Sequence, residues 1–361
     1  MPVAVLLLLP FIGSVVSALL PTRARNALAG WAGLVSAAAA LGVISLFSRV
    51  RDGGVIRETV SWVPSLGLDL ILRVDGLSWM VAVLVTVIGA LVSLYARYYM
   101  SPEDPVARFY SFFLAFMGAM LGVVFSGNLV QLVVFWELTS LVSFLLIGYW
   151  HHRMDAQRGA FMALTVTGAG GLALLGGVIV LGHIVGSYDL DTLLASGDLV
   201  RGHPLYPVAL ILTLLGALTK SAQFPFHFWL PRAMAAPTPV SAYLHSATMV
   251  KAGVFLLARL WPALSGTEEW FWLVSGAGMT TLLLGAYIAM FQYDLKRVLA
   301  YSTVSHLGLI TLLFGLNSSL AAVAGVFHMM NHATFKASLF MAAGVVDHET
   351  GTRDIRRLNG L

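Results

Sequence analysis

The chain has 361 residues, of which 58% are hydrophobic and only 11% are charged. A soluble domain carries roughly a quarter charged residues, so this composition excludes an ordinary soluble protein and indicates one that lies in a bilayer. The net charge is +4 without basic runs, which argues against a nucleic-acid partner. The absence of cysteine excludes disulfides and thiolate metal sites.

Long apolar runs predict membrane-spanning helices, because about 18 to 25 such residues cross the hydrocarbon core of a bilayer. In chain order the runs cover residues 2–20, 27–47, 77–97, 108–126, 128–149, 160–183, 206–230, 237–261, 270–291, 298–316 and 320–346. We therefore expect an all-α polytopic membrane protein with about 11 transmembrane helices.

The basic residues of the connecting loops predict the orientation. Alternate loops, beginning with the one that holds Arg23 and Arg25, contain twelve basic residues, and the opposite loops contain six. Cytoplasmic loops carry an excess of lysine and arginine, so this bias places the N-terminus outside and the C-terminus in the cytoplasm.

The long outer loop over residues 50–76 reads partly as strands. Val60 precedes a Pro-Ser-Leu-Gly sequence, and Leu68, Leu70 and Leu72 alternate after it, which predicts a short β-hairpin. Glycines cluster in the sixth span and predict close helix packing there. A phosphate-binding loop is not favoured at these glycines, because no lysine or acidic partner follows them.

The lysines are distributed differently from the arginines. Three of the four lysines, Lys220, Lys251 and Lys336, fall inside predicted spans, whereas none of the seventeen arginines is expected at similar depth. Arginine stays charged at any accessible pH, but a desolvated lysine can lose its proton. A site that alternates between charged and neutral forms needs lysine, so this partition predicts a path for protons.

Glu137 is the only acidic residue well inside a span, near the middle of residues 128–149. A charge at that depth costs several kcal/mol unless it is paired or hydrated. One interpretation is a glutamate–lysine pair that only holds two helices together. Three lysines and several histidines within spans favour a path for protons or cations.

Pro225 breaks the seventh predicted span shortly after Lys220. Proline removes the hydrogen bond to the carbonyl of Ser221, which must then find water, a polar side chain or an ion. Broken helices at membrane depth line cavities and recur at the ion sites of transporters. An ordinary proline kink is the alternative, and the adjacent lysine favours a functional break.

Histidines accompany the lysines on the later spans. They are His245 with Thr248 and Lys251 in the eighth span, His306 in the tenth, and His328 and His332 with Asn331 and Lys336 in the eleventh. On continuous helices these residues form polar stripes, which fit a proton relay. A metal site at the two histidines of the eleventh span is the competing idea. We predict none, because no carboxylate or third ligand is evident.

Three stretches resemble the antiporter-like subunits of respiratory complex I and of Mrp-type cation/proton antiporters. They are Lys-Ser-Ala-Gln-Phe-Pro-Phe-His-Phe-Trp-Leu-Pro from Lys220, residues 235–254, and Phe335-Lys336-Ala337. The resemblance covers essentially the whole chain. It is strongest to the A-type subunits of the Mrp antiporters, because that type has a lysine at the position of Lys251.

The resemblance implies two inverted five-helix repeats, each with one broken helix. It divides the chain into residues 1–107 with three helices and the hairpin, residues 108–261 as the first repeat, and residues 270–361 as an incomplete second repeat. The family continues past Leu361 into a second broken helix. We therefore expect this chain to be the N-terminal part of a longer subunit.

The resemblance also implies roles for individual residues. Glu137 pairs with Lys220 of the broken helix, Lys251 and His245 form the central relay, and Lys336 continues it in the eleventh span.

The implied activity is proton conduction in a multi-subunit monovalent cation (Na⁺)/H⁺ antiporter of the bacterial cytoplasmic membrane. Such a chain is a secondary transporter subunit rather than an enzyme, works with other subunits, and needs no cofactor. The alternatives are a proton-pumping L-type subunit of an NADH–quinone oxidoreductase or membrane hydrogenase and, from another class, a non-transporting scaffold subunit.

Overall fold

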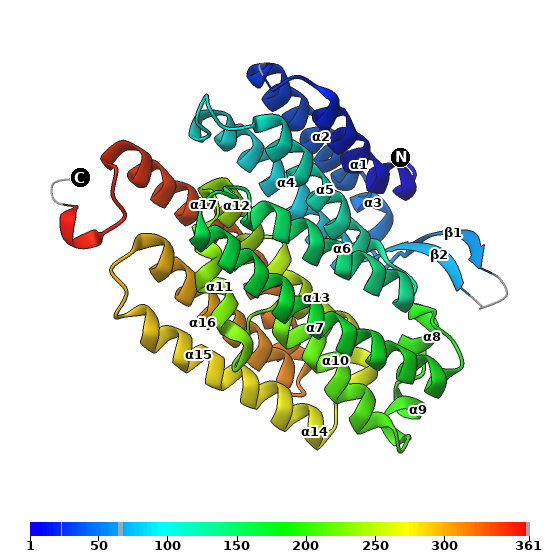
Figure 1. Ribbon diagram of the computed structural model, residues 1–361. Helices are drawn as coiled ribbons and strands as arrows, with labels where there is room; N and C mark the ends of the chain where they lie inside the picture. The colour runs from blue at the N-terminus through cyan, green and yellow to red at the C-terminus, as the bar shows by residue number, and fades with distance from the viewer. Residues whose placement is uncertain (23, 64–67, 359–361) are drawn as a thin grey trace.

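The computed structural model describes residues 1–22, 24–63 and 68–358, and its helices run along one common direction in a single bundle (Figure 1). The longer helices are α1 (Val3–Leu19), α2 (Arg25–Ser45), α4 (Gly76–Tyr99), α5 (Val106–Phe125), α6 (Leu129–Ile147), α7 (Met154–Val185), α10 (Tyr206–Lys220), α12 (Thr238–Ser246), α13 (Met249–Leu264), α15 (Gly276–Ala289), α16 (Leu295–Gly315) and α17 (Ser319–Thr350). The short helices are α3 (Phe47–Val50), α8 (Leu190–Ala195), α9 (Gly197–Gly202), α11 (Trp229–Arg232) and α14 (Glu268–Trp270). Single turns cover Phe226–Phe228, Ala233–Ala235, Phe271–Ser275 and Ile355–Arg357. The predicted helical class is confirmed.

In the part of the chain that the structure describes, fewer helices than the predicted 11 are long and apolar enough to count as membrane spans. Among the described residues, eight helices are long and apolar enough to cross a membrane, and α1 and α10 are shorter apolar helices. The long helix α17 is not among the eight, because His328, Asn331, His332 and Lys336 make it less apolar. Each predicted span nevertheless coincides with one helix or with two consecutive helices.

Two groups of three consecutive helices are built in the same way. The first group is α5, α6 and α7, and the second is α15, α16 and α17. The third helix has 32 residues in both groups and ends at a glycine in the left-handed conformation, Gly186 or Gly351. Glycine adopts this backbone conformation without the penalty that a Cβ atom brings.

After that glycine, the backbone in each group returns to the start of the second helix. Asn128, which caps α6, pairs with Asp189, and Asp294, which caps α16, pairs with Asp354, in isolated antiparallel bridges. The first bridge lies beside the hairpin and the second near the C-terminus, at opposite ends of the bundle (Figure 1). A motif that recurs with reversed orientation is what inverted repeats produce.

The predicted hairpin is confirmed. It consists of β1 (Ile56–Val63) and β2 (Leu68–Val74), which pair in antiparallel register, while its turn at 64–67 lies outside the described residues.

The hairpin is attached to the first helix through Glu58 of β1. The carboxylate of Glu58 accepts hydrogen bonds from the amides of Val3 and Ala4 at 2.8 and 3.0 Å. These amides begin α1 and have no partner within the helix, so the carboxylate satisfies donors that would otherwise stay free.

Charged side chains fasten the hairpin to the helices. This outer ion cluster consists of Arg57, Arg73, Asp75, Asp189, Asp191 and Arg259. Asp75, which caps α4, accepts hydrogen bonds from Arg259 at 3.0 Å and from Arg73. Arg259 counts among the six basic residues expected in the opposite loops, and that expectation is wrong. The residue is buried within α13, where Asp75 supplies the partner that a buried charge requires.

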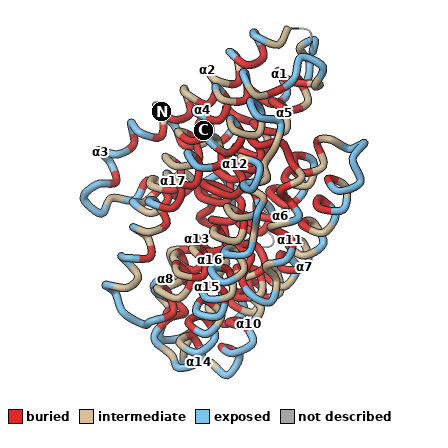
Figure 2. The backbone as a smooth tube through the Cα atoms, turned by 90° about the vertical axis from the view of Figure 1, so that its left-hand side faces the viewer, coloured by how far each residue is buried: buried red, intermediate tan, exposed pale blue. Residues whose placement is uncertain are grey.

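The most deeply buried helices lie in the middle of the bundle (Figure 2). In α5 and in the α12–α13 pair, 83% of the most apolar stretch is buried, against 28% in α14–α15. The central helices therefore face protein, and the peripheral ones leave most of their apolar side chains uncovered by the described residues.

The close packing predicted at the glycines of the sixth span is confirmed, and Gly170 and Gly177 pack against α10. A Cβ atom at Gly170 would lie 1.8 Å from Oγ1 of Thr219, and one at Gly177 would lie 2.7 Å from Oγ1 of Thr213. These glycines therefore allow α7 to approach the helix that carries Lys220.

The Asp75 carboxyl makes the outer ion cluster sensitive to pH. Burial alone would raise the pKa of Asp75, but the hydrogen bond and charge of Arg259, with the Ser78 amide and Arg73, hold that pKa below its ordinary range. A lowered pKa means that the folded protein binds this proton less readily than the unfolded chain does. The stabilisation is present above the ordinary carboxyl pKa of about 4 and is lost as the pH falls below it.

We predict that Asp75→Asn lowers the free energy of unfolding at neutral pH by about 2 kcal/mol, because Arg259 stays buried and loses its charged partner. The difference from the wild type shrinks as the pH falls below about 4. Thermal unfolding in detergent over a pH series measures both effects. Asp52→Asn, which removes the partner of Arg51 in an exposed ion pair, is the control with no expected change. Identical pH profiles for wild type and Asp75→Asn would contradict the prediction.

Candidate functional site

All four lysines of the chain lie inside the protein. Lys220 and Lys251 are 0% exposed, Lys336 is 1% exposed and Lys296 is 2% exposed. Their ammonium groups contact carbonyl oxygens, a hydroxyl and a histidine ring. In the part of the chain that the structure describes, no carboxylate pairs with any of them.

Lys296 is a buried lysine that the sequence pattern does not predict, because it counts among the twelve basic residues expected in the cytoplasmic loops. It lies in the first turn of α16, and its Nζ donates to the carbonyl of Ala236 at 2.7 Å. The signal that could have found Lys296 is the scarcity of lysine in this chain. In a chain of seventeen arginines and four lysines, every lysine is a candidate for a buried site.

The predicted break in the seventh span is confirmed. Helix α10 ends at Lys220, and helical structure resumes only after Pro225. The carbonyl of Ser221, which Pro225 cannot satisfy, accepts a hydrogen bond from Nε2 of Gln223 at 2.9 Å. A protein side chain therefore holds the freed carbonyl, and Oε1 of Gln223 is left buried without a partner among the described residues.

The hydroxyl of Ser221 joins this break to α13. It donates to the carbonyl of Val250 at 2.7 Å and accepts from the amide of Val254 at 3.0 Å. An uninterrupted α-helix pairs these two backbone groups with each other. Gly253 makes room for the insertion, since a Cβ atom there would lie 2.1 Å from the carbonyl oxygen of Ala217.

Lys220 lies against α6. Its Nζ donates to Oγ of Ser140 at 2.7 Å and to the carbonyl of Trp136 at 3.1 Å, and it lies 5.2 Å from the centre of the Trp136 ring. These partners are neutral, and they lie four residues apart on one face of the helix.

The predicted ion pair between Glu137 and Lys220 is not formed. Glu137 follows Trp136 by one residue and is therefore turned by about 100° around α6. Its carboxyl group faces α7, where a Cβ atom at Gly171 would lie 1.5 Å from Oε1. That oxygen is buried and has no hydrogen-bond partner among the residues described.

The predicted eighth span contains a break of its own. Helix α12 gives way to α13 around Thr248, whose hydroxyl donates to the carbonyl of Tyr243 at 2.8 Å. The expected continuous stripe from His245 through Thr248 to Lys251 is therefore wrong, because the regular helical turn between these residues is interrupted.

Lys251 meets the histidines of the tenth and eleventh predicted spans. Its Nζ contacts Nδ1 of His332, and both residues are fully buried. The ring of His332 lies 5.3 Å from that of His306, whose Nδ1 is 3.0 Å from Nε2 of His328. We call these three residues the histidine cluster. Within the described ranges, no group of three or more histidine, aspartate or glutamate side chains is arranged to hold a metal ion.

Lys336 lies next to the histidine cluster, and His245 lies apart from it. Nζ of Lys336 donates to the carbonyl of Leu299 at 3.3 Å. His245 is buried with its ring centre 6.3 Å from those of Trp229 and Phe340, and neither of its nitrogens has a hydrogen-bond partner in the described part of the chain.

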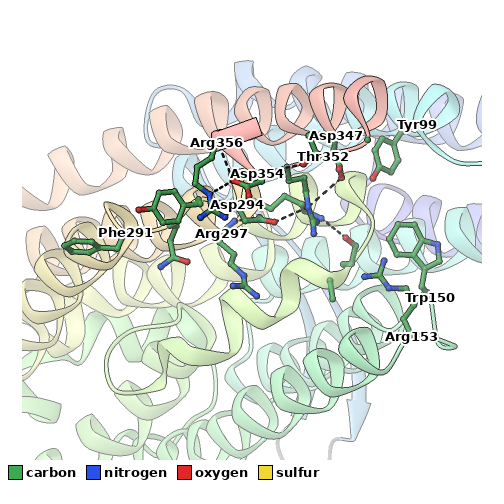
Figure 3. A pocket seen from close by; sticks show the side chains of 17 residues that line it. Tyr99, Trp150, Arg153, Phe291, Asp294, Arg297, Asp347, Thr352, Asp354 and Arg356 are labelled. Carbon is green, nitrogen blue, oxygen red and sulfur yellow. Dashed lines mark hydrogen bonds and ion pairs between the residues drawn. The ribbon is translucent and has the colours of Figure 1, made fainter. Parts of the chain in front are cut away.

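A polar cavity of about 750 Å³ lies at the end of the bundle near the C-terminus (Figure 3). Arg353 places its Nε 3.2 Å from Asp294 and 3.9 Å from Asp347 in this cavity. Lys296 belongs to its lining. Of the four buried lysines, Lys296 is thus the one that borders this large polar space, which we call the inner cavity.

Two family models match the chain. The family described as NADH:quinone oxidoreductase/Mrp antiporter, transmembrane, matches residues 126–361, and the family described as NADH-ubiquinone oxidoreductase (complex I), chain 5 N-terminus, matches residues 61–110.

Curated relatives are similar over nearly the whole chain. The A/B subunit of a probable K⁺/H⁺ antiporter of Rhizobium meliloti is 66% identical over 99% of this chain and 36% of its own length. The A-type subunit of the Na⁺/H⁺ antiporter of Alkalihalophilus pseudofirmus is 51% identical over 98% of this chain and 46% of its own length. The chain spans less than half the length of these relatives.

Two solved structures share the fold. A chain of the Mrp complex from Dietzia sp. DQ12-45-1b superposes with a TM-score of 0.87 and 38% identity, over 99% of this chain and 39% of that one. A chain of the archaeal membrane-bound sulfane sulfur reductase gives the same TM-score at 24% identity, over 99% and 74%. The second likeness concerns the fold alone.

We predict that Gly253→Ala destabilises the protein by about 1–3 kcal/mol, because the new methyl group separates α10 from α13 and displaces the Ser221 hydroxyl. Gly33→Ala is the matched control. A Cβ atom at Gly33, also within a helix, meets nothing within 4 Å, so alanine there leaves the stability unchanged or slightly raised. Thermal unfolding of both variants in detergent is the measurement, and equal unfolding temperatures would contradict the prediction.

Proposed function

Because this chain belongs to the NADH:quinone oxidoreductase/Mrp antiporter family, we propose that it is the proton-conducting part of a monovalent cation/proton antiporter. The observation that carries the proposal is the burial of all four lysines beside neutral partners. A buried ammonium group with a neutral partner can release its proton far more readily than one locked to a carboxylate. Lysines in this setting are better suited to proton transfer than to holding two helices together.

The proposed path runs from Lys220 to Lys251, through the histidine cluster, and on to Lys336. The Ser221 hydroxyl links the helix of Lys220 to the helix of Lys251, and His332 connects Lys251 to α17. Histidine both accepts and donates protons, so the cluster can pass a proton between the lysines. Water completes the path where side chains do not touch. His245, buried with two free nitrogens among the described residues, is a further proposed stop.

Glu137 is proposed to control Lys220 by charge. When its carboxylate turns toward the ammonium group, the protonated form of Lys220 is favoured. When it faces α7, as here, the ammonium group of Lys220 has its hydrogen bonds, among the described residues, with Ser140 and Trp136 only. Moving one charge across 100 mV is worth about 2.3 kcal/mol. That energy is comparable to the several kcal/mol by which a partner charge stabilises a buried ion, so a membrane potential can drive the change.

The inner cavity is the proposed entrance on the cytoplasmic side, with Lys296 as its first proton carrier. This assignment follows the proposed orientation in the bacterial cytoplasmic membrane, with the N-terminus outside. Residues 1–107, 108–261 and 270–361 are the proposed units, and the recurring bridges at Asn128 and Asp294 support the inverted repeat.

We further propose that the chain works as one component of a multi-subunit transporter rather than as an enzyme. The relatives named as Na⁺/H⁺ and K⁺/H⁺ antiporter subunits support this reading. They also favour an antiporter over an L-type subunit of a redox complex.

We predict that Lys220→Ala abolishes proton-coupled cation exchange in the intact complex. Lys220→Arg abolishes it as well, because a guanidinium group holds its proton at any accessible pH. Exchange is measured in inside-out membrane vesicles as the collapse of a pH gradient after sodium or potassium is added. Assembly is checked on native gels.

Arg49→Gln removes a positive charge from an exposed position outside the path and serves as the control that retains exchange. Wild-type exchange in both Glu137→Ala and Lys220→Ala would overturn the proposed path and support a scaffold role instead.

A further inference from the structure

Two grooves flank the start of α7, at the end of the bundle that also holds the inner cavity. Their volumes are about 430 and 570 Å³, and they share Gln157 and Phe161 in their walls. Phe161 is 60% exposed, so a large aromatic ring stands between the grooves and is largely uncovered by the described residues.

The first groove combines a cation with an aromatic floor. Phe112, Phe144 and Phe161 line its apolar part, and Arg108 lies at its polar end. Arg108 donates from Nη2 to the carbonyl of Tyr149 at 2.7 Å and stands 5.0 Å from the centre of that ring. Its Nε is buried and has no hydrogen-bond partner among the described residues. The guanidinium group is therefore held in place at the polar end of the groove.

The second groove repeats this combination on the other side of Phe161. Arg158 and Arg232 supply the charge, and Met162 and Phe228 supply apolar surface. Neither arginine forms an ion pair within the described ranges. No aspartate or glutamate among the described residues lines either groove, so both carry an uncompensated positive charge.

Cations beside an apolar groove at the membrane boundary fit the phosphate and acyl chains of an anionic phospholipid. A soluble anion would leave the aromatic floors uncovered, and a lipid with one phosphate would neutralise only one groove. We infer that the paired grooves bind a phospholipid with two phosphates. One phosphate lies at Arg108, the other lies at Arg158 and Arg232, and acyl chains fill both floors. This inference is independent of the proposed transport activity.

The test uses the full-length protein, purified in detergent and stripped of lipid. Diphosphatidylglycerol or a doubled concentration of phosphatidylglycerol is added, and bound lipid is counted by native mass spectrometry. We expect one diphosphatidylglycerol to bind more tightly than phosphatidylglycerol at equal phosphate. Arg158→Gln and Arg232→Gln alter exposed side chains, so the fold is retained, and each weakens this binding about fivefold. Arg108→Gln does the same from the other groove.

Arg97→Gln is the matched control, because Arg97 is exposed and lines neither groove. It leaves lipid binding unchanged. Equal affinity for the two lipids at equal phosphate would overturn the inference. So would an equal loss in Arg97→Gln, which would mean attraction to general surface charge. Full displacement of the lipid by inorganic phosphate would overturn it too, because it would assign the site to a soluble anion.

Discussion

The cost of burying an ammonium group without a carboxylate is the constraint on which the rest of this structure depends. An ion removed from water loses several kcal/mol of solvation, and a lone neutral acceptor returns only part of it. Lys220 therefore needs both a hydroxyl and a carbonyl of α6, as well as the face of Trp136. Lys251 needs the ring nitrogen of His332. Each lysine thus stays inside the protein on neutral partners, and this neutrality is what the proposed proton transfer rests on.

Irregular backbone and small residues make these partners available. The break after Lys220 allows Ser221 to insert into α13, and Gly253 leaves the space for that hydroxyl. Gly170 brings α7 against α10 from the other side. Breaks of this kind survive at membrane depth only where protein surrounds them, and α12 and α13 are among the most buried elements of the bundle (Figure 2).

The two ends of the bundle contain arginine–aspartate ion pairs, whereas its middle contains lysines on neutral partners. Beside the hairpin, Arg57 pairs with Asp189, and at the opposite end Arg353 pairs with Asp294. Each pair lies at one of the two recurring backbone bridges. Arginine keeps its charge, so such pairs hold the two ends of the bundle, whereas the lysines between them are the proposed proton carriers. Ion pairs of permanent charge thus lie at both ends of the bundle, on either side of the proposed path.

The sequence by itself determined the helices, the hairpin, the break at Pro225 and the selection of lysine for buried positions. Apolar length, strand alternation and proline chemistry act locally, so each can be read from neighbouring residues. The tertiary structure alone decided which groups the buried polar side chains contact. Lys220 meets Ser140 and Trp136 rather than Glu137, Thr248 interrupts a helix that looks continuous, and Lys296 is buried although it begins a helix next to a loop. These outcomes depend on how one helix is rotated against another, and that rotation is set by contacts between residues far apart in the chain.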